Sequence, residues 1–194
     1  MSINIFAIDC DLITCPSGSL GAAGVMDINC DPNLNQSEVN SLLMTHPTLG
    51  TLVTNWGAGL VIGDFSIDNA DATNVDQKRF FGVGDLAASE PLSVVTNNFN
   101  SNVLMRTFTL NFSIFDLSPA TYDYFRKLQC STVKPLLWFT TVAQKIKGKD
   151  GGISLTSITV DTPLERGEES VERIDIVMTW KAKTSPDSYD SPLP

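Results

Sequence analysis

Between residues 107 and 114, apolar and polar side chains alternate without a break. Because the side chains of a β-strand point alternately to its two faces, this pattern predicts a half-buried strand. The period changes at Ser118, which can cap a helix, and Pro119 suits the first helical position because no partner is needed there for its missing N–H. We therefore expect a helix over about residues 119–129. Its apolar stripe, at spacings of three residues, consists of Tyr122, Phe125 and Leu128.

Several other segments alternate or form short apolar runs, which predict further strands. Residues 79–95 combine glycines with mixed periods and predict short strands with a bend. Two apolar runs at 51–56 and 59–68 are separated by glycines and predict a hairpin or paired strands. The remaining predicted strands are 2–9, 135–143, 153–161 and 169–182.

The intervening segments lack a strand pattern. Ser37 could cap a short helix over 37–44, which Pro47 would close. Residues 184–194 are polar and proline-rich, so we expect a flexible C-terminal tail. The other predicted connections are a loop at 16–37, a polar loop at 69–78, a turn at 97–102 and a cationic hairpin tip at 145–152.

Together these elements predict a mainly β fold, an antiparallel β-sandwich or barrel with one helix at about 119–129 on its flank. The strands and helices do not alternate as they do in parallel α/β folds. The chain has 194 residues, of which 42% are hydrophobic, which is enough for one domain with a sizeable core. We expect that domain to span residues 1–183, with a loop-rich part at 16–50, and to be followed by the tail at 184–194.

The chain is acidic, with 22 Asp and Glu against 13 Lys and Arg and a formal net charge of −9. Specific binding to nucleic acid needs cations that displace the counterions of phosphates, so this balance argues against it. No segment reaches the ~20 apolar residues of a membrane span. The N-terminal stretch lacks a basic region and carries Asp9 and Asp11, unlike a signal peptide. We expect a protein made and assembled in the cytoplasm.

Residues that could carry chemistry do not form a recognisable motif. His46 is the only histidine, and no nucleophile-elbow sequence accompanies it. A zinc site would need Cys10, Cys15, Cys30 and His46 to converge, but their spacings match no compact zinc motif. We expect these cysteines and Cys130 to be reduced thiols packed as small apolar residues. A disulfide from Cys10 to Cys15 or to Cys30 remains an alternative.

Other candidate sites are explained more simply as loops. The polar run 31–37 has oxygen-bearing side chains at alternate positions, as a calcium loop does, but Gln36 and Leu42 stand where that loop needs glycine and glutamate. The pair Glu168–Glu169 falls at a turn, where solvated charges are expected. The glycines at 82 and 84 lack the third glycine of a dinucleotide site. We therefore predict no catalytic, cofactor-binding or metal-binding residues, no cofactor, and a protein that is not an enzyme.

The order of elements in the second half of the chain resembles the tail tube proteins of long-tailed bacteriophages. The segments that carry the resemblance are 107–129, 135–144 and 153–182, about half of the chain. In that superfamily, a β-sandwich or barrel carries one helix on its flank, and subunits close into hexameric rings that stack into a tube.

The resemblance implies a virion structural protein that forms homo-oligomeric rings, contacts other tail or neck proteins, and lets DNA pass without specific binding. Assembly would take place in the cytoplasm of the host bacterium. Candidate arms are 69–78, 145–152 and 184–194, and Lys145, Lys147 and Lys149 could contact a neighbouring subunit. A neck, collar or tail-completion ring remains an alternative. A monomeric β-sandwich adhesin, using Trp56, Tyr122, Tyr124 and Trp138 as stacking platforms, is another.

Overall fold

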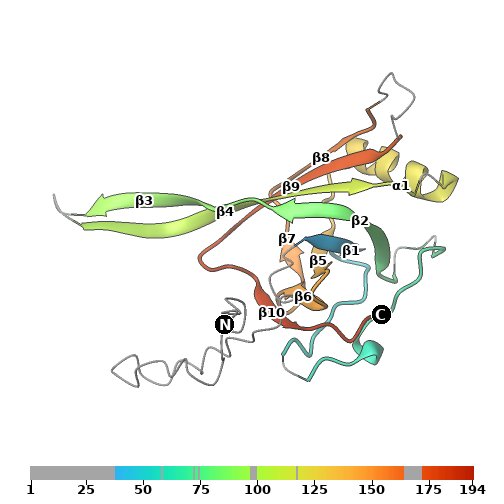
Figure 1. Cartoon of the computed structure of the whole chain (residues 1–194), viewed down its shortest axis with the longest axis horizontal. Helices are drawn as coiled ribbons and strands as arrows, with labels where there is room; N and C mark the ends of the chain where they lie inside the picture. Colours follow the sequence, from blue (N-terminus) through green and yellow to red (C-terminus); the bar gives the residue numbers. More distant parts are fainter. Residues whose placement is uncertain are drawn as a thin grey trace, which may run out of the picture. The chain divides into compact units, whose positions relative to one another are not determined.

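One antiparallel sheet of ten strands organises the chain in the computed structural model (Figure 1). The structure describes residues 38–57, 59–71, 73, 75–96, 100–116, 118–163 and 172–194, with side chains at all of these except 94–96 and 100–103. All of them belong to one unit, Ser37–Pro194. The strand predicted at 2–9 and the loop predicted at 16–37 lie outside the described residues.

The strands follow the order β10-β6-β5-β1-β2-β4-β9-β8, with β3 added to β4 and β7 to β5. This path does not close, so the fold is an open, sandwich-like sheet and not a barrel. The prediction of a mainly β fold with one helix is confirmed. The elements are β1 Val39–Thr45, η3 Ile62–Asp64, β2 Lys78–Leu86, β3 Glu90–Thr96, β4 Asn100–Ile114, α1 Pro119–Cys130, β5 Leu136–Thr141, β6 Lys145–Gly148, β7 Ile153–Ser154, β8 Ser157–Asp161, β9 Ile174–Ala182 and β10 Asp187–Asp190.

The sheet folds over itself around a first core. Phe139 on β5 lies 6.3 Å from Trp180 on β9, centroid to centroid, although β1, β2 and β4 separate these strands within the sheet. The alternation in β4 and β9 supplies the inner face, because Phe108, Leu110 and Ile114 are buried together with the even-numbered residues of β9. The two halves of one sheet therefore pack face to face, as two sheets do in a sandwich.

The helix α1 covers this core much as the sequence predicts. Ser118 Oγ accepts a hydrogen bond of 3.4 Å from Thr121 N, so it caps the helix that Pro119 opens. Phe125 is buried and lies 4.8 Å from the Phe80 ring. The predicted place of Tyr122 in the buried stripe is wrong, because its side chain is 38% exposed. Tyr124 packs there instead.

Strand β1 is buried on both of its faces. Leu42 belongs to the first core, while Leu43 belongs to a second core on the opposite side, which also contains Trp138 and Ile146. The helix predicted over 37–44 is therefore wrong. A strand covered on both faces has no reason to alternate, and its continuous apolar run is easily taken for a helical stripe.

The second core is covered by segments that the sequence analysis placed elsewhere. Residues 51–68 are not the predicted hairpin: they form loops and the single-turn helix η3, and only Ile67 makes a bridge, to Gln77. The predicted flexible tail at 184–194 is also wrong. Its residues form β10 against β6, and Leu193 is buried in the second core. Residues 145–148, predicted as a hairpin tip, are strand β6 inside the sheet.

The predicted polar loop at 69–78 is organised around Asp71. Its carboxylate accepts hydrogen bonds from the Thr73 hydroxyl at 2.6 Å and from the Thr73, Val75 and Asp76 backbone N–H groups at 2.8, 2.7 and 3.0 Å. The Thr73 hydroxyl, followed by these backbone donors, lowers the pKa of Asp71 well below its usual value. Lys78 Nζ donates to the Asp71 carbonyl at 2.6 Å, so the loop also satisfies a buried cation.

Candidate functional site

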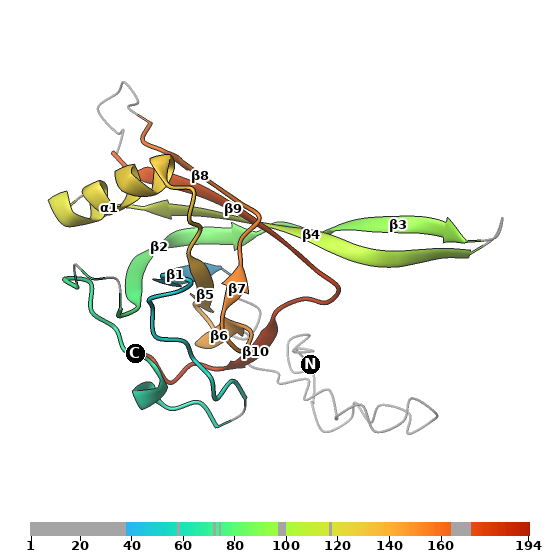
Figure 2. The ribbon, with the colours of Figure 1, turned by 180° about the vertical axis from the view of Figure 1, so that it is seen from behind.

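Strand β3 and the first part of β4 form a two-stranded arm, residues 90–96 and 100–105. The two strands pair from Glu90 opposite Thr107 to Thr96 opposite Asn100, whereas β9 begins to pair with β4 only at Arg106 and β2 only at Leu110. Both views show the arm extending past the ends of the other strands (Figures 1 and 2). Among the described residues, 100–105 thus have no strand neighbour except β3.

Large apolar side chains are exposed on this arm. Leu92 is 54% exposed and pairs with Met105, which is 38% exposed. The register shifts at Leu92/Ser93, so Leu104 has no residue opposite it, and 47% of its surface is exposed. Clustered apolar side chains on an exposed surface are typical of contact sites. Sequence reasoning missed this arm: it predicted a turn over 97–102, although residues 100–102 already belong to β4, and the available signal was the pair of apolar runs on either side of that segment.

A different surface covers the outer side of β2, β4, β9 and β8, opposite the first core; we call it the polar face. Asn111 Nδ2 donates to Asp85 Oδ2 at 3.3 Å, and Ser113 Oγ donates to Asp175 Oδ1 at 2.6 Å. Arg173 Nε lies 3.0 Å from both oxygens of the Asp175 carboxylate. The face also carries hydroxyls at Thr109, Ser157, Thr159 and Thr179.

Apolar side chains interrupt the polar face mainly on β2. Phe81 is 59% exposed and Val83 is 50% exposed, at alternate positions of that strand. The Arg79 guanidinium carbon lies 4.5 Å from the centroid of the Phe81 ring, a cation–π contact. Arg79 is itself buried, with Nε donating to Ser41 Oγ at 3.2 Å and Nη2 to the Pro194 carbonyl at 2.7 Å.

The outer strands of the sheet are less available for pairing than the arm. At β8, Gln129 Nε2 donates to the Val160 carbonyl at 2.6 Å, and Lys134 Nζ donates to the Thr156 carbonyl. Side chains from α1 and the loop after it therefore occupy backbone acceptors that a further strand would need. At the opposite end, β10 has only 4 residues. The arm offers the longer open edges in the described part of the chain.

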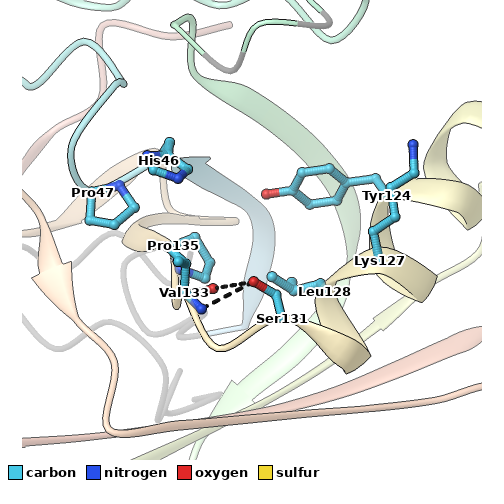
Figure 3. A pocket seen from close by; sticks show the side chains of 8 residues that line it. All are labelled: His46, Pro47, Tyr124, Lys127, Leu128, Ser131, Val133 and Pro135. Carbon is cyan, nitrogen blue, oxygen red and sulfur yellow. Dashed lines mark hydrogen bonds between the residues drawn. The ribbon is translucent and has the colours of Figure 1, made fainter.

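His46 lines a pocket of about 290 Å³ between the loop after β1, the helix α1 and the loop that follows α1 (Figure 3). Its Nδ1 accepts hydrogen bonds from the backbone N–H groups of Thr48 and Leu49 at 3.3 and 3.2 Å. Backbone N–H groups only donate, so Nδ1 carries no proton and the neutral ring carries it on Nε2. The hydroxyl of Ser131, also in the pocket, is bonded to the Val133 backbone, and the described residues contribute no carboxylate to the lining.

Most of the other residues weighed in the sequence analysis lie where the structure makes no assignment. Cys10, Cys15, Cys30, Asp31 and the pair 168–169 lie outside the described residues. Cys130 is an exposed free thiol, so its predicted packing as a small core residue is wrong. In the described part of the chain, no group of three or more His, Cys, Asp or Glu side chains could hold a metal ion.

Some of the contact residues expected from the sequence have partners within the chain. Lys145 Nζ lies 2.5 Å from Asp190 Oδ1, which ties β6 to β10. Of the aromatic residues considered as stacking platforms, Trp138 is fully buried, and Trp56 packs edge-on against Tyr189 at 5.9 Å. Only Tyr122 among them is classed as exposed.

Comparison with known proteins adds no assignment: the chain matches no family model, no curated protein and no solved structure. Across the described residues, α1 and η3 are both too short and too polar to cross a bilayer as a helix.

Proposed function

We propose that this chain is a virion structural protein that assembles into rings, and that the rings form the tail tube through which phage DNA passes. The proposal assigns the chain no catalytic role. The observation that carries it is the arm, which exposes Leu92, Leu104 and Met105 and has open strand edges.

A two-stranded ribbon with an exposed apolar surface is marginal by itself in water. Pairing or packing against a second copy of the chain would bury Leu92 and Leu104 and satisfy the open backbone groups. A contact between the arm of one copy and a different surface of the next is head-to-tail. Contacts of this kind generate rings when the rotation closes.

The polar face supports the assignment of a channel. Apart from Phe81 and Val83, it carries mainly hydroxyl and amide side chains, with carboxylates at Asp85, Asp161 and Asp175 and two cations, Lys181 and the Arg173 that contacts Asp175, in a chain with a net charge of −9. A wall with these groups repels phosphates and offers them no line of cations, so DNA would move along it without being held. A neck or tail-completion ring is a variant of this proposal. It would use the same arm and polar face at a different place in the virion.

Sedimentation velocity and negative-stain microscopy of the full chain test the proposal. We expect large rings or tubes for the wild type. Replacing Leu92, Leu104 and Met105 together by serine should weaken self-association by more than tenfold. The matched control replaces Leu49, Val61 and Ile62, which are 59%, 57% and 60% exposed, and should assemble as the wild type does.

A wild-type chain that stays monomeric at high concentration would rule out the proposal. If the variant of Leu92, Leu104 and Met105 assembles as the wild type does, the arm is not the contact between subunits.

A further inference from the structure

The pocket beside His46 is not used by the proposed assembly surfaces. Pro47 and Pro135 lie on its loop side, beside His46, and Leu128 lies on the opposite side, which α1 forms (Figure 3). Its polar groups come from three different segments: His46 after β1, Tyr124 and Lys127 on α1, and Ser131 after the helix. The fold itself therefore forms the pocket. The side made by the loops at Pro47 and Pro135 is mainly apolar, and the side made by α1 and Ser131 is mainly polar.

The Tyr124 hydroxyl points into this pocket (Figure 3). Its ring is held by stacking on Phe80 at 5.2 Å and by an edge contact with Phe125 at 5.2 Å, so the hydroxyl cannot easily turn away. Burial raises the pKa of Tyr124 to about 12, so the hydroxyl stays protonated and is a hydrogen-bond donor. No described residue forms a hydrogen bond with it, so it can donate to an acceptor that enters the pocket.

The free polar groups around the pocket are donors. Besides the Tyr124 hydroxyl, they are the ammonium group of Lys127 and the imidazole of His46, whose Nδ1 is already occupied. Ser131 is engaged with the Val133 backbone, and no aspartate or glutamate is among the described residues that line the pocket. In a chain with a net charge of −9, a pocket with a cation and no carboxylate is complementary to an anion.

We propose that this pocket binds a carboxylate carried on a small apolar body. A carboxylate only accepts hydrogen bonds, which matches the Tyr124 hydroxyl. Its one negative charge suits the Lys127 ammonium, which is turned away from that hydroxyl and would reach a ligand by rotation of its side chain (Figure 3). A phosphate fits less well, because its second charge and further oxygens would face the apolar wall at Pro47 and Pro135. The carboxylate belongs either to a free small carboxylic acid or to an acidic side chain of a second copy of this chain. The second source rests on the proposed function.

Binding of para-fluorobenzoate to the full chain, followed by fluorine NMR of the ligand, tests the first source. We expect saturable broadening of its signal, and none for para-fluorobenzyl alcohol, which has the same ring without the carboxylate. Tyr124→Phe removes only the hydroxyl and should weaken binding by roughly tenfold or more, the loss expected for a hydrogen bond to a charged group. Lys127→Gln should have a similar effect.

Two matched controls isolate the pocket. Tyr122→Phe makes the same change on the same helix outside the pocket, and Arg126→Gln removes the same charge one residue from Lys127. Neither should alter binding. Equal binding of the acid and the alcohol would show an apolar pocket only and would overturn the proposal.

Sedimentation of the same four variants tests the second source. If an acidic side chain of a neighbour fills the pocket, the wild type will not bind fluorobenzoate in its assembled state. Tyr124→Phe and Lys127→Gln will then weaken self-association by about tenfold, and the two controls will not. If no ligand binds and no variant changes assembly, the proposal is wrong. Sedimentation of the wild type alone shows separately whether the proposed function has failed.

Discussion

Strand β1 and the arm contain similar apolar runs in the same sheet, yet their surroundings are opposite. In β1, the side chains of Val39, Leu42, Leu43 and Met44 are all 0% exposed. In the arm, Leu92, Leu104 and Met105 are 54%, 47% and 38% exposed. An apolar run in a strand therefore does not by itself show what it packs against.

The difference follows from what surrounds each segment. β1 has β2 on one side and β5 on the other, and a core on each face. The described part of the arm has one strand neighbour along 100–105, and Leu104 and Met105 there are exposed. The chain itself buries the apolar residues of β1, whereas the described residues leave those of the arm exposed, and we propose that a second copy covers them. The predictions below follow from this contrast, beginning with the largest expected effect.

Substitutions in β1 should be the most destabilising. Leu42→Ala opens a cavity in the first core and Leu43→Ala one in the second, and each should lower the free energy of unfolding by about 2–5 kcal/mol. Chemical denaturation monitored by tryptophan fluorescence gives both values. The control Leu49→Ala, at a residue that is 59% exposed, should change it by less than about 0.5 kcal/mol. A small effect at only one of the two sites would show that β1 is covered on one face.

The C-terminal segment should behave like β1 and unlike the arm. Leu193 is 7% exposed within the second core, so Leu193→Ala should cost about 2 kcal/mol, while Leu193→Met should be close to neutral. Removing residues 184–194 should destabilise further, because β6 would lose its partner β10. Calorimetric melting of the three variants checks this order. A truncated chain that melts like the wild type would support the flexible tail that the sequence predicted.

Sequence patterns predicted those elements of the fold in which one face is buried and the other is solvated. β4, α1 and β9 were found because their buried residues repeat at the period of the element. Phe108, Phe125 and Ile176 are members of these three series. β1 was mistaken for a helix because burial on both faces removes that period. The tail was mistaken for a flexible segment because one apolar residue, Leu193, and a four-residue strand anchor it, and neither gives a periodic signal.

The candidate site was less predictable than the fold. His46 attracted attention as the only histidine, but its ring is bonded to the local backbone. Tyr124 appeared less important than Tyr122 because the spacing of three residues placed Tyr122 with Phe125. An α-helix turns every 3.6 residues, so a residue at either edge of the apolar stripe can point toward the core or toward solvent. Only the packing on Phe80 decides between the two tyrosines.

The Asp71 loop should show a smaller effect that depends on pH. Because hydrogen bonds depress the pKa of Asp71 in the folded state, its stabilising contribution is present above the unfolded value near 4 and is lost as the pH falls through the folded pKa. Asp71→Asn should therefore lower the melting temperature at pH 7, and the difference from the wild type should shrink below about pH 4. The control Asp123→Asn should show no such trend. A difference that grew in acid would contradict the assigned hydrogen bonds.

The smallest effect on stability should come from the arm. Leu104 and Leu110 lie on the same strand β4, but Leu104 is 47% exposed and Leu110 is 0% exposed. At a protein concentration low enough to keep the chain monomeric, Leu104→Ser should change the free energy of unfolding by less than about 0.5 kcal/mol. Leu110→Ser should cost several-fold more, because it opens a cavity and buries a hydroxyl.

At higher protein concentration, Leu104→Ser should lower stability relative to the wild type, since in the proposed assembly a second copy buries the Leu104 side chain. Denaturation curves at two concentrations measure both effects in one experiment. The wild type should gain stability with concentration by mass action, and Leu104→Ser should gain less. If Leu104→Ser instead unfolds the monomer as readily as Leu110→Ser does, the arm packs on its own chain. Its apolar surface would then have no bearing on assembly.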